Sequence, residues 1–418
     1  MAILVDGSFF IKDAFRVFSK NLDYNKRLDY MRYKTMRILC ITDKLHNEEE
    51  TSIKGVFEKY LLEYAEVHCV YFTKDSKAYK PCFENNRFIL PYSTKHRKFI
   101  QNFMNLGGNL LDYDFIIVRN FYGIAKQILP FHRQVIFWET FPHDYRRLYE
   151  AQRDKKAIGR KKLEYKIKFF LHNKILNKCI AYLTMTPQLQ KTFQPNLKIP
   201  VHCIPSGIDF ELLNDEAIMH NITSINQPLK LIYIGAIDEN RELAKIMEAI
   251  SEAKGEFNLD IFSGSSNQEA EKIRQITTKD TRISLRPPLP FSNLLTRLST
   301  YDVGLGIIPN TPLYSVSSPI KAMEYAGNGV IPLLNDLPEY LRLFDESTAF
   351  FVANEPNAIT QKIETILNTP KEQLIAKKQA TFKNAQERMD YKIITKNFYN
   401  FLLSLQSSNL HTNQITGD

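Results

Sequence analysis

Residues 315–334, with the sequence SVSSPIKAMEYAGNGVIPLL, combine side chains that could hold a phosphorylated ribose. Ser317 and Ser318 precede Pro319, a combination typical of a helix start, where several backbone N–H groups lack partners. Either serine could cap these groups, and the positive end of the helix dipole suits a phosphate. Glu324 follows one to two turns later, where its carboxylate could accept hydrogen bonds from ribose hydroxyls. A capped surface helix of an ordinary α/β domain is the alternative.

The same short helix carries a lysine and ends at glycines. Lys321 would lie on a face adjacent to Glu324, where it could neutralise a phosphate or pair with that carboxylate; an exposed lysine is the plain alternative. Gly327 and Gly329 are typical of a helix end. The apolar run VIPLL that follows them indicates a buried strand.

Buried strands alternate with helices along most of the chain. In the first half, apolar runs lie at 36–42, 67–72, 114–119, 134–138, 180–184 and 201–205, with helical stretches such as 52–65 between them. The second half has such runs at 229–235, 259–264, 283–285, 302–309, 329–334 and 349–353. Continuous apolar strands that alternate with helices imply parallel sheets covered on both faces. The sequence therefore predicts two tandem doubly wound, Rossmann-like α/β domains, with a ligand cleft between the carboxyl ends of their strands.

Length and composition agree with a two-domain globular protein. A chain of 418 residues, with 44% hydrophobic and 24% charged residues, exceeds one ordinary core. No apolar window is long enough to predict a membrane-spanning helix, and the N-terminus lacks the pattern of a secretory signal. The five cysteines are scattered without metal-ligand spacing, so we expect reduced thiols, no metal site and a cytoplasmic protein.

The net charge of +9 is concentrated in one segment. Residues 146–178 hold 12 Lys or Arg and 3 Asp or Glu, an excess that equals the charge of the whole chain. Apolar residues recur there at helical spacing: Leu163, Ile167, Phe170, Leu171 and Ile175. A basic amphipathic helix can lie on an anionic membrane. The basic residues assigned to this membrane or acceptor surface are Arg160, Lys161, Lys162, Lys166 and Lys168. The alternative is that the apolar stripe packs on the sheet and the lysines are solvated. We expect no nucleic-acid partner, because nothing resembles a base-reading module.

The stretch 315–334 resembles the nucleotide-sugar site of the GT-B glycosyltransferases, in particular the retaining, family 4-like (group 1) enzymes. Their second domain has a similar Pro-x-Lys-x-x-Glu helix, and the family glutamate that holds the ribose corresponds to Glu324. Other similar segments follow the family order: CIPSGIDF (203–210), YIGAIDENREL (233–243) with Gly235 in its glycine turn, and RPPLPFSNLLTRLSTYDVGLGIIP (286–309). The motifs cover residues 203–334, whereas the first domain is matched by pattern alone.

Two positions depart from the family pattern. A basic pair after the glycine turn holds the donor diphosphate in the family, but here Ala236 replaces its arginine and Arg241 is the available cation. Arg241 could clamp a phosphate or be a solvated helix residue. The family's first glutamate, which contacts the donor sugar, corresponds to Val316; the serine-lined helix start could substitute for it in part.

The resemblance also points to residues of the first domain. Gly55 occupies the position of the family's glycine loop, where its small size would let backbone approach the donor phosphates or the acceptor; a glycine at an ordinary helix start is the alternative. Glu139 and His143 follow a buried strand, where such enzymes often place an acid or a histidine that faces the acceptor. They are our catalytic candidates together with Arg241, although a polar-loop histidine often has no such role. Trp138 is expected in the core.

The family architecture divides the chain into four parts. We assign 1–35 to an N-terminal extension, with Met31 and Met36 as sensible alternative initiators, and 36–205 to an acceptor-side domain. Residues 206–390 would form the nucleotide-sugar domain. Residues 391–418 would form a helix that crosses back to the first domain and a flexible tail from Gln406.

The resemblance implies a bacterial glycosyltransferase that uses a UDP- or GDP-linked sugar. It would transfer the sugar with retention, without a metal or other cofactor, to a glycan or lipid-linked acceptor in surface polysaccharide synthesis, at the cytoplasmic side of the inner membrane. The helix start and Arg241 would stabilise the departing diphosphate. Ala236 and Val316 favour a second hypothesis, a non-catalytic relative that binds a nucleotide or glycan or partners another transferase. A nucleotide-sugar epimerase of the same architecture is a third.

Overall fold

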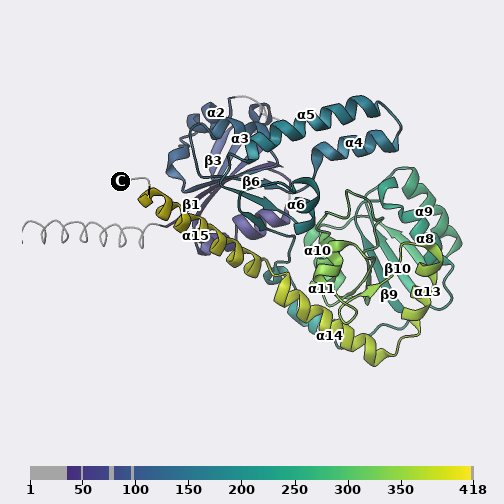
Figure 1. The fold of residues 1–418 in the computed structure, drawn as a ribbon. Helices are drawn as coiled ribbons and strands as arrows, with labels where there is room; N and C mark the ends of the chain where they lie inside the picture. The colour runs from purple at the N-terminus through teal and green to yellow at the C-terminus, as the bar shows by residue number, and fades with distance from the viewer. Residues whose placement is uncertain (1–34, 49, 75–79, 96–97, 416–418) are drawn as a thin grey trace, which may run out of the picture.

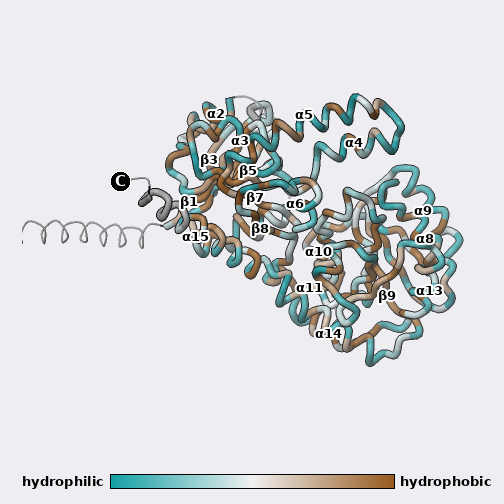
Figure 2. The backbone as a smooth tube through the Cα atoms, in the orientation of Figure 1, coloured by the Kyte–Doolittle hydropathy of each residue, from teal (hydrophilic) through white to brown (hydrophobic). Residues whose placement is uncertain are grey.

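The computed structural model describes residues 35–48, 50–74, 80–95 and 98–415. The predicted N-terminal extension lies outside these ranges except for its last residue. The described chain forms two α/β domains, and two long C-terminal helices run from the second domain back to the first (Figure 1). Brown, hydrophobic strands run through the middle of each domain (Figure 2). Within the described ranges, no helix combines the length and the apolar character needed to cross a membrane.

The first domain contains an eight-stranded sheet in the order β3-β4-β2-β1-β5-β6-β7-β8, parallel except for the β3–β4 pair. Its strands are β1 (Arg37–Leu45), β2 (Glu66–Thr73), β3 (Cys82–Glu84), β4 (Arg87–Pro91), β5 (Phe115–Arg119), β6 (Val135–Glu139), β7 (Ala181–Thr184) and β8 (Val201–Cys203). Its helices are α2 (Phe99–Asn105), α3 (Tyr122–Ile128), α4 (His143–Arg153), α5 (Ile158–Leu176) and α6 (Pro187–Phe193). The six predicted strands are present, and the β3–β4 hairpin adds an antiparallel edge.

The stretch predicted to be helical over residues 52–65 is helical, but it is not one continuous α-helix. The chain instead makes a π-helical turn (Ile53–Phe57) and a 3-10 turn (Tyr60–Glu63). Tyr391 packs closely on this segment, because a Cβ atom on Gly55 would meet its ring carbons at 2.5–3.0 Å. A glycine at position 55 is therefore what allows the Tyr391 ring to lie against this backbone.

The second domain contains a six-stranded parallel sheet in the order β11-β10-β9-β12-β13-β14. Its strands are β9 (Leu229–Ile234), β10 (Phe257–Phe262), β11 (Ile283–Arg286), β12 (Val303–Leu305), β13 (Ile331–Leu334) and β14 (Phe350–Phe351). Its helices are α7 (Asp215–Asn221), α8 (Leu243–Ser251), α9 (Gln268–Lys279), α10 (Phe291–Leu298), α11 (Ile320–Gly327), α12 (Pro338–Leu343), α13 (Pro356–Leu367) and α14 (Lys371–Arg388). The prediction of two doubly wound domains is confirmed.

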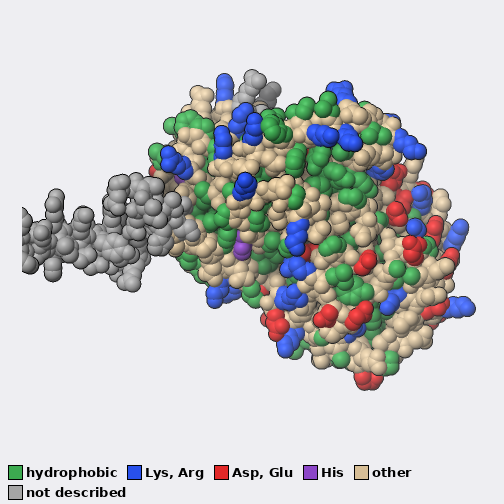
Figure 3. All heavy atoms as spheres, viewed as in Figure 1, with side chains coloured by type: hydrophobic (Ala, Val, Ile, Leu, Met, Phe, Trp, Pro, Cys, Tyr) green, Lys and Arg blue, Asp and Glu red, His purple; other side chains and the backbone are tan. Residues whose placement is uncertain are grey.

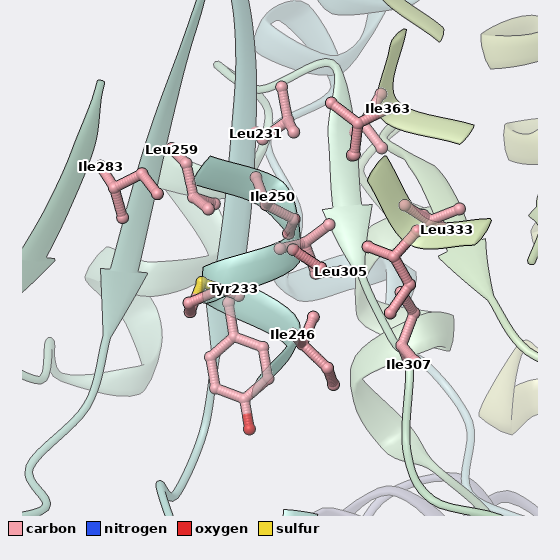
Figure 4. Close-up of a cluster of buried hydrophobic side chains, with 14 of the residues drawn as sticks. Leu231, Tyr233, Ile246, Ile250, Leu259, Ile283, Leu305, Ile307, Leu333 and Ile363 are labelled. Carbon is pink, nitrogen blue, oxygen red and sulfur yellow. The ribbon is translucent and has the colours of Figure 1, made fainter. Parts of the chain in front are cut away.

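Alternate strand residues build the core of the second domain. Leu231 and Tyr233 of β9 and Leu259 of β10 point to the face that is covered by Ile250 of α8 and Ile363 of α13 (Figure 4). The opposite face is covered in part by α10 and α11. This side-chain period of two is what fixes the position of every strand in the sheet.

The C-terminal helix α15 (Tyr391–Ile415) returns to the first domain. Tyr391, Ile394, Phe398 and Leu402 are buried in the core cluster that also holds the inner residues of β1 and β2. The helix continues to Ile415, so it includes the first part of the segment from Gln406 that is predicted to be a flexible tail. Helix α15 therefore contributes buried side chains to the core of the first domain.

A buried ion pair ties α14 to the second domain. Lys378 and Asp302 are both fully buried, and the lysine Nζ lies 2.8 Å from Asp302 Oδ1. Lys378 also donates to Asn221 Oδ1 at 2.7 Å and to the Ser224 carbonyl at 3.0 Å. Burial lowers the pKa of Lys378, and the neighbouring Asp302 opposes this shift.

Candidate functional site

A cavity of about 430 Å³ lies between the two domains. Thr51, Lys54 and Gly55 of the first domain line one side of it, together with five residues of the domain junction: Gly207, Ile208, Asp209, Leu212 and Leu213. The first turn of α10 and one face of α11 form the other, and Tyr391 of α15 closes the lining. The cavity thus lies where parallel sheets of this kind bind ligands.

Glu324 faces this cavity from α11. Ile320, Glu324 and Asn328 recur every four residues and all three line the cavity, as one face of a helix should. Among the described residues, the Glu324 carboxylate has no hydrogen-bond or ion-pair partner. Burial raises its pKa to about 7, and only Lys321 acts in the opposite direction. A half-buried carboxylate without a protein donor is prepared to accept hydrogen bonds from a ligand.

Lys321 places an ammonium group beside the glycine turn after β9. Its Nζ lies 4.0 Å from the centroid of the Tyr233 ring and 3.3 Å from the point that a Cβ atom on Gly235 would occupy. Gly235 has a φ of +130°, a conformation that favours glycine. Burial lowers the pKa of Lys321 to about 7, and the positive charge of Arg241 adds to this effect. An incoming anion would restore the charge of this lysine.

Arg241 is the second cation near the same turn. It forms an ion pair with Asp238, and its guanidinium carbon lies 5.9 Å from the centroid of the Tyr314 ring. The structure therefore brings Gly235, Lys321 and Arg241 close to one turn, although none of the three lines the cavity. A phosphate at Arg241 would have to compete with the Asp238 carboxylate.

The serines before α11 do not cap it. The helix begins at Ile320, and its N-cap residue is Pro319, without a side-chain cap. Ser317 Oγ donates to the Tyr314 carbonyl at 2.8 Å, and Ser318 Oγ accepts from the Ser206 N–H at 3.1 Å. The prediction of serine capping is wrong, because both hydroxyls are used to hold the loop and the domain junction. The N–H groups of the helix start remain free of a side-chain cap.

Val316 joins the two domains. Its fully buried side chain packs with Leu189 and Phe193 of α6 in the first domain, and Tyr145 lies against the same cluster. The Thr186 hydroxyl donates to the Val316 carbonyl at 2.8 Å. The position of the family's first glutamate is thus occupied by an inter-domain contact.

Replacing Val316 by glutamate should open the cleft. An unpaired carboxylate at this buried position would cost several kcal/mol in its ionised form, so we expect the domains to separate and the radius of gyration from X-ray scattering to rise. Val316→Ala removes volume but no apolar character, and it should keep the closed shape. Unchanged scattering from a folded Val316→Glu variant would contradict the assignment of this contact.

The predicted residues of the first domain lie in different places. Gly55 lines the cavity, next to the Tyr391 ring. Glu139 is buried at the end of β6 and lines a separate small pocket rather than the cavity. Its carboxylate accepts from the hydroxyls of Tyr182 at 2.5 Å and Tyr122 at 3.2 Å, while burial raises its pKa. These bonds are those of a buried acid held in place by its neighbours.

His143 is the first residue of α4 and does not line the cavity. Its side chain is exposed, yet desolvation by the surrounding protein atoms lowers its pKa. The charges of Asp43 and Arg119, which form an ion pair, act on it in opposite directions. That ion pair lies near the carboxyl ends of β1 and β5, and the sequence did not predict it because its members are far apart in the chain.

Helix α5 exposes the predicted apolar stripe. Leu163, Ile167, Phe170 and Leu171 are between 51% and 61% exposed, so the alternative in which they pack on the sheet is wrong. Ile175 alone packs against the first-domain core. Figure 1 shows α4 and α5 side by side as a hairpin that projects from the domain, and hydrophobic and basic side chains adjoin in that region (Figure 3).

The basic residues of α5 are divided between ion pairs and open surface. Lys161 and Lys168 pair with Glu164 at 3.0 and 3.1 Å. Arg160, Lys162 and Lys166 are exposed. The last three leave positive charge beside the apolar stripe.

No model of a known protein family matches the chain, and no curated protein matches it in sequence. Its structure is similar to sucrose-phosphate synthase from Thermosynechococcus elongatus, with a TM-score of 0.67 and 14% identity over 89% of this chain and 100% of that one. Anabaena HepE, solved with UDP and glucose, gives a TM-score of 0.62 and 10% identity over 88% of this chain and 100% of HepE. The UDP-forming α,α-trehalose-phosphate synthase from Burkholderia vietnamiensis gives a TM-score of 0.61 and 10% identity over 89% of this chain and 100% of the synthase. The chain therefore has the GT-B fold, as its motifs predicted.

Proposed function

We propose that the chain is a glycosyltransferase that moves a sugar from a nucleoside-diphosphate donor to an acceptor. The observation that carries this proposal is the Glu324 carboxylate, which faces the inter-domain cavity without a partner among the described residues, beside the cation of Lys321. Ribose hydroxyls would supply the missing donors. The presence of UDP and glucose in the similar structure of HepE supports a UDP-linked sugar; a GDP-linked sugar is the alternative.

The reaction needs stabilisation of the departing diphosphate. Gly235 lets the backbone approach it, while Lys321, Arg241 and the uncapped start of α11 supply positive charge. Preorganised groups of this kind stabilise developing negative charge without a metal ion. Retention at the sugar carbon is proposed from the resemblance to family 4-like enzymes. Glu139 and His143 remain candidates for catalytic residues that face the acceptor, although neither lines the cavity.

The acceptor is proposed to be a glycan or lipid-linked glycan of a bacterial surface polysaccharide, reached from the cytoplasmic face of the inner membrane. The exposed apolar and basic surface of α5 supports this location. Apolar side chains would enter the interface between headgroups and acyl chains, and basic side chains would meet anionic lipid.

Removing positive charge from α5 should weaken membrane binding. The triple variant Arg160→Gln/Lys162→Gln/Lys166→Gln should lose about 1 kcal/mol per charge, or about 100-fold in partitioning to vesicles that contain phosphatidylglycerol. Lys254→Gln/Lys279→Gln/Lys371→Gln changes three exposed lysines of the second domain and should bind as the wild type does. Flotation assays measure both, and equal losses in the two triple variants would contradict a role for this helix.

Release of nucleoside diphosphate from a panel of UDP- and GDP-sugars tests the proposed reaction. We expect release from one donor, stimulated by a glycan acceptor. The packing of Val316 against the first domain favours a second candidate, a non-catalytic nucleotide-binding protein. Nucleotide binding without release of nucleoside diphosphate from any donor would support this candidate. Conversion of the donor sugar without an acceptor would indicate an epimerase.

A further inference from the structure

One face of the second-domain sheet is left uncovered near the amino-terminal ends of its strands. In β10 and β11, inward residues such as Leu259 and Ile283 are buried under α8 and α9, whereas Asn258, Asp260 and Ser284 alternate with them and are polar. On that second face, α10 packs only on residues nearer the carboxyl ends of the strands. Alternation of this kind indicates a sheet face open to solvent.

The open face is the floor of a pocket of about 210 Å³. Four cationic side chains and one carboxylate line it: Lys230, Arg282, Arg286, Arg297 and Asp260. Asn258, Ser284 and Thr300 add amide and hydroxyl groups. None of these residues lines the cavity that holds Glu324, so the pocket is distinct from the candidate nucleotide site.

The charges within the pocket do not balance. Arg282 is fully engaged by Asp280 and by the carbonyls of Ser251, Ala253 and Gly255. Arg286 uses its Nε to bond Asp260 Oδ1 at 2.8 Å.

Two cations are left over. Over the ranges that the structure describes, neither Lys230 nor Arg297 has a carboxylate within ion-pair distance, and the terminal nitrogens of Arg286 have no acceptor. Arg297 lies in the last turn of α10 with its guanidinium carbon 5.9 Å from the centroid of the Tyr301 ring. It hydrogen-bonds the Tyr301 hydroxyl, and the other donors of its guanidinium can serve a ligand.

We infer that this pocket binds a small molecule through its phosphate group. Lys230, Arg286 and Arg297 would each donate charge-assisted hydrogen bonds to phosphate oxygens, the pairing that a guanidinium fork suits best. The ligand would touch the last turn of α10, whose first turn, with Phe291 and Ser292, lines the nucleotide cavity. This inference does not depend on the proposed transferase activity.

Calorimetry with pyrophosphate at low ionic strength tests the site. The measurement uses the Lys321→Gln chain, in which the phosphate position of the cleft is weakened, and compares it with the same chain carrying Lys230→Gln/Arg297→Gln. Saturable binding is expected in the first chain, with a loss of about tenfold or more in the second. Lys254→Gln/Lys279→Gln, in the same Lys321→Gln background, alters the net charge equally at exposed positions outside the pocket and should bind as the parent does.

Two results would overturn the inference: no saturable binding to the Lys321→Gln chain, or the same loss in the control pair as in the pocket pair. Thermal unfolding of each variant shows whether the chain is folded. If the pocket pair unfolds, Lys230→Arg/Arg297→Lys, which keeps both charges, provides the folded comparison and should retain binding. No sugar nucleotide or turnover is involved, so failure here is separate from failure of the transferase proposal.

Discussion

Replacing Glu324 by alanine is expected to weaken nucleoside-diphosphate binding by about 100- to 1,000-fold. The carboxylate faces the cavity without a partner among the described residues, so two ribose hydroxyls can donate to it. Each hydrogen bond to a charged group contributes about 1.5–3 kcal/mol, and two of them at the lower end correspond to about 3 kcal/mol, or more than 100-fold in affinity. Calorimetric titration with UDP and GDP measures the loss.

The dependence of this binding on pH adds a second readout. The pKa of Glu324 is raised to about 7, so the protonated form dominates below pH 7 and the affinity should fall as the pH drops. The pKa of Lys321 is lowered to about 7, so its charge is lost above pH 7 and the affinity should fall there too. Glu324→Ala should remove the fall in affinity below pH 7 and keep the fall above pH 7. Glu256→Ala, at an exposed position of the second domain, should behave as the wild type, and identical titrations of the two variants would refute the role of Glu324.

Replacing Asp302 by alanine is expected to destabilise the second domain by about 3–5 kcal/mol, the range measured when one partner of a buried ion pair is removed. Lys378 would keep Asn221 and carbonyl partners but would lose the carboxylate at 2.8 Å that balances its buried charge. Asp302 also accepts from the Lys230 N–H at 2.8 Å, and this bond is lost as well. At about 2–4 °C per kcal/mol for a domain of this size, the melting temperature should fall by about 6–20 °C.

An exposed ion pair on α14, the helix that carries Lys378, is the matched control for the Asp302 substitution. Lys383 and Glu387 lie 3.9 Å apart on the solvent side of α14 and are both mostly exposed. Lys383→Ala should change the free energy of unfolding by at most about 0.5 kcal/mol. Equal melting temperatures for Asp302→Ala and Lys383→Ala would show that the buried ion pair contributes no more to stability than the exposed one.

The sequence predicted best those features that depend on residues close together in the chain. Every predicted strand is present, because continuous apolar runs between helices have few other stable arrangements than a covered parallel sheet. Lys321 and Glu324 are three residues apart on one helix, so their common location followed from the helix period. Gly235 lies at the end of β9 next to that helix, as the order of the motifs suggested.

Contacts between distant residues were not visible in the sequence. The Ser206 N–H donates to Ser318 Oγ, and the Thr186 hydroxyl donates to the Val316 carbonyl. Each of these hydrogen bonds joins segments that are more than 100 residues apart. The sequence predicts Glu139 as an acid that faces the acceptor, but the hydroxyls of Tyr122 and Tyr182 bond its carboxylate inside the domain. Tyr391 packs against Gly55 and lines the cavity, and only the expectation that its helix crosses back pointed towards it.

A crystal structure with UDP or GDP bound tests the central claim most directly. The account predicts ribose oxygens within about 2.5–3.2 Å of the Glu324 carboxylate and the diphosphate beside Lys321 and Gly235. A nucleotide found outside the inter-domain cavity, or one whose ribose has no contact with Glu324, would contradict it.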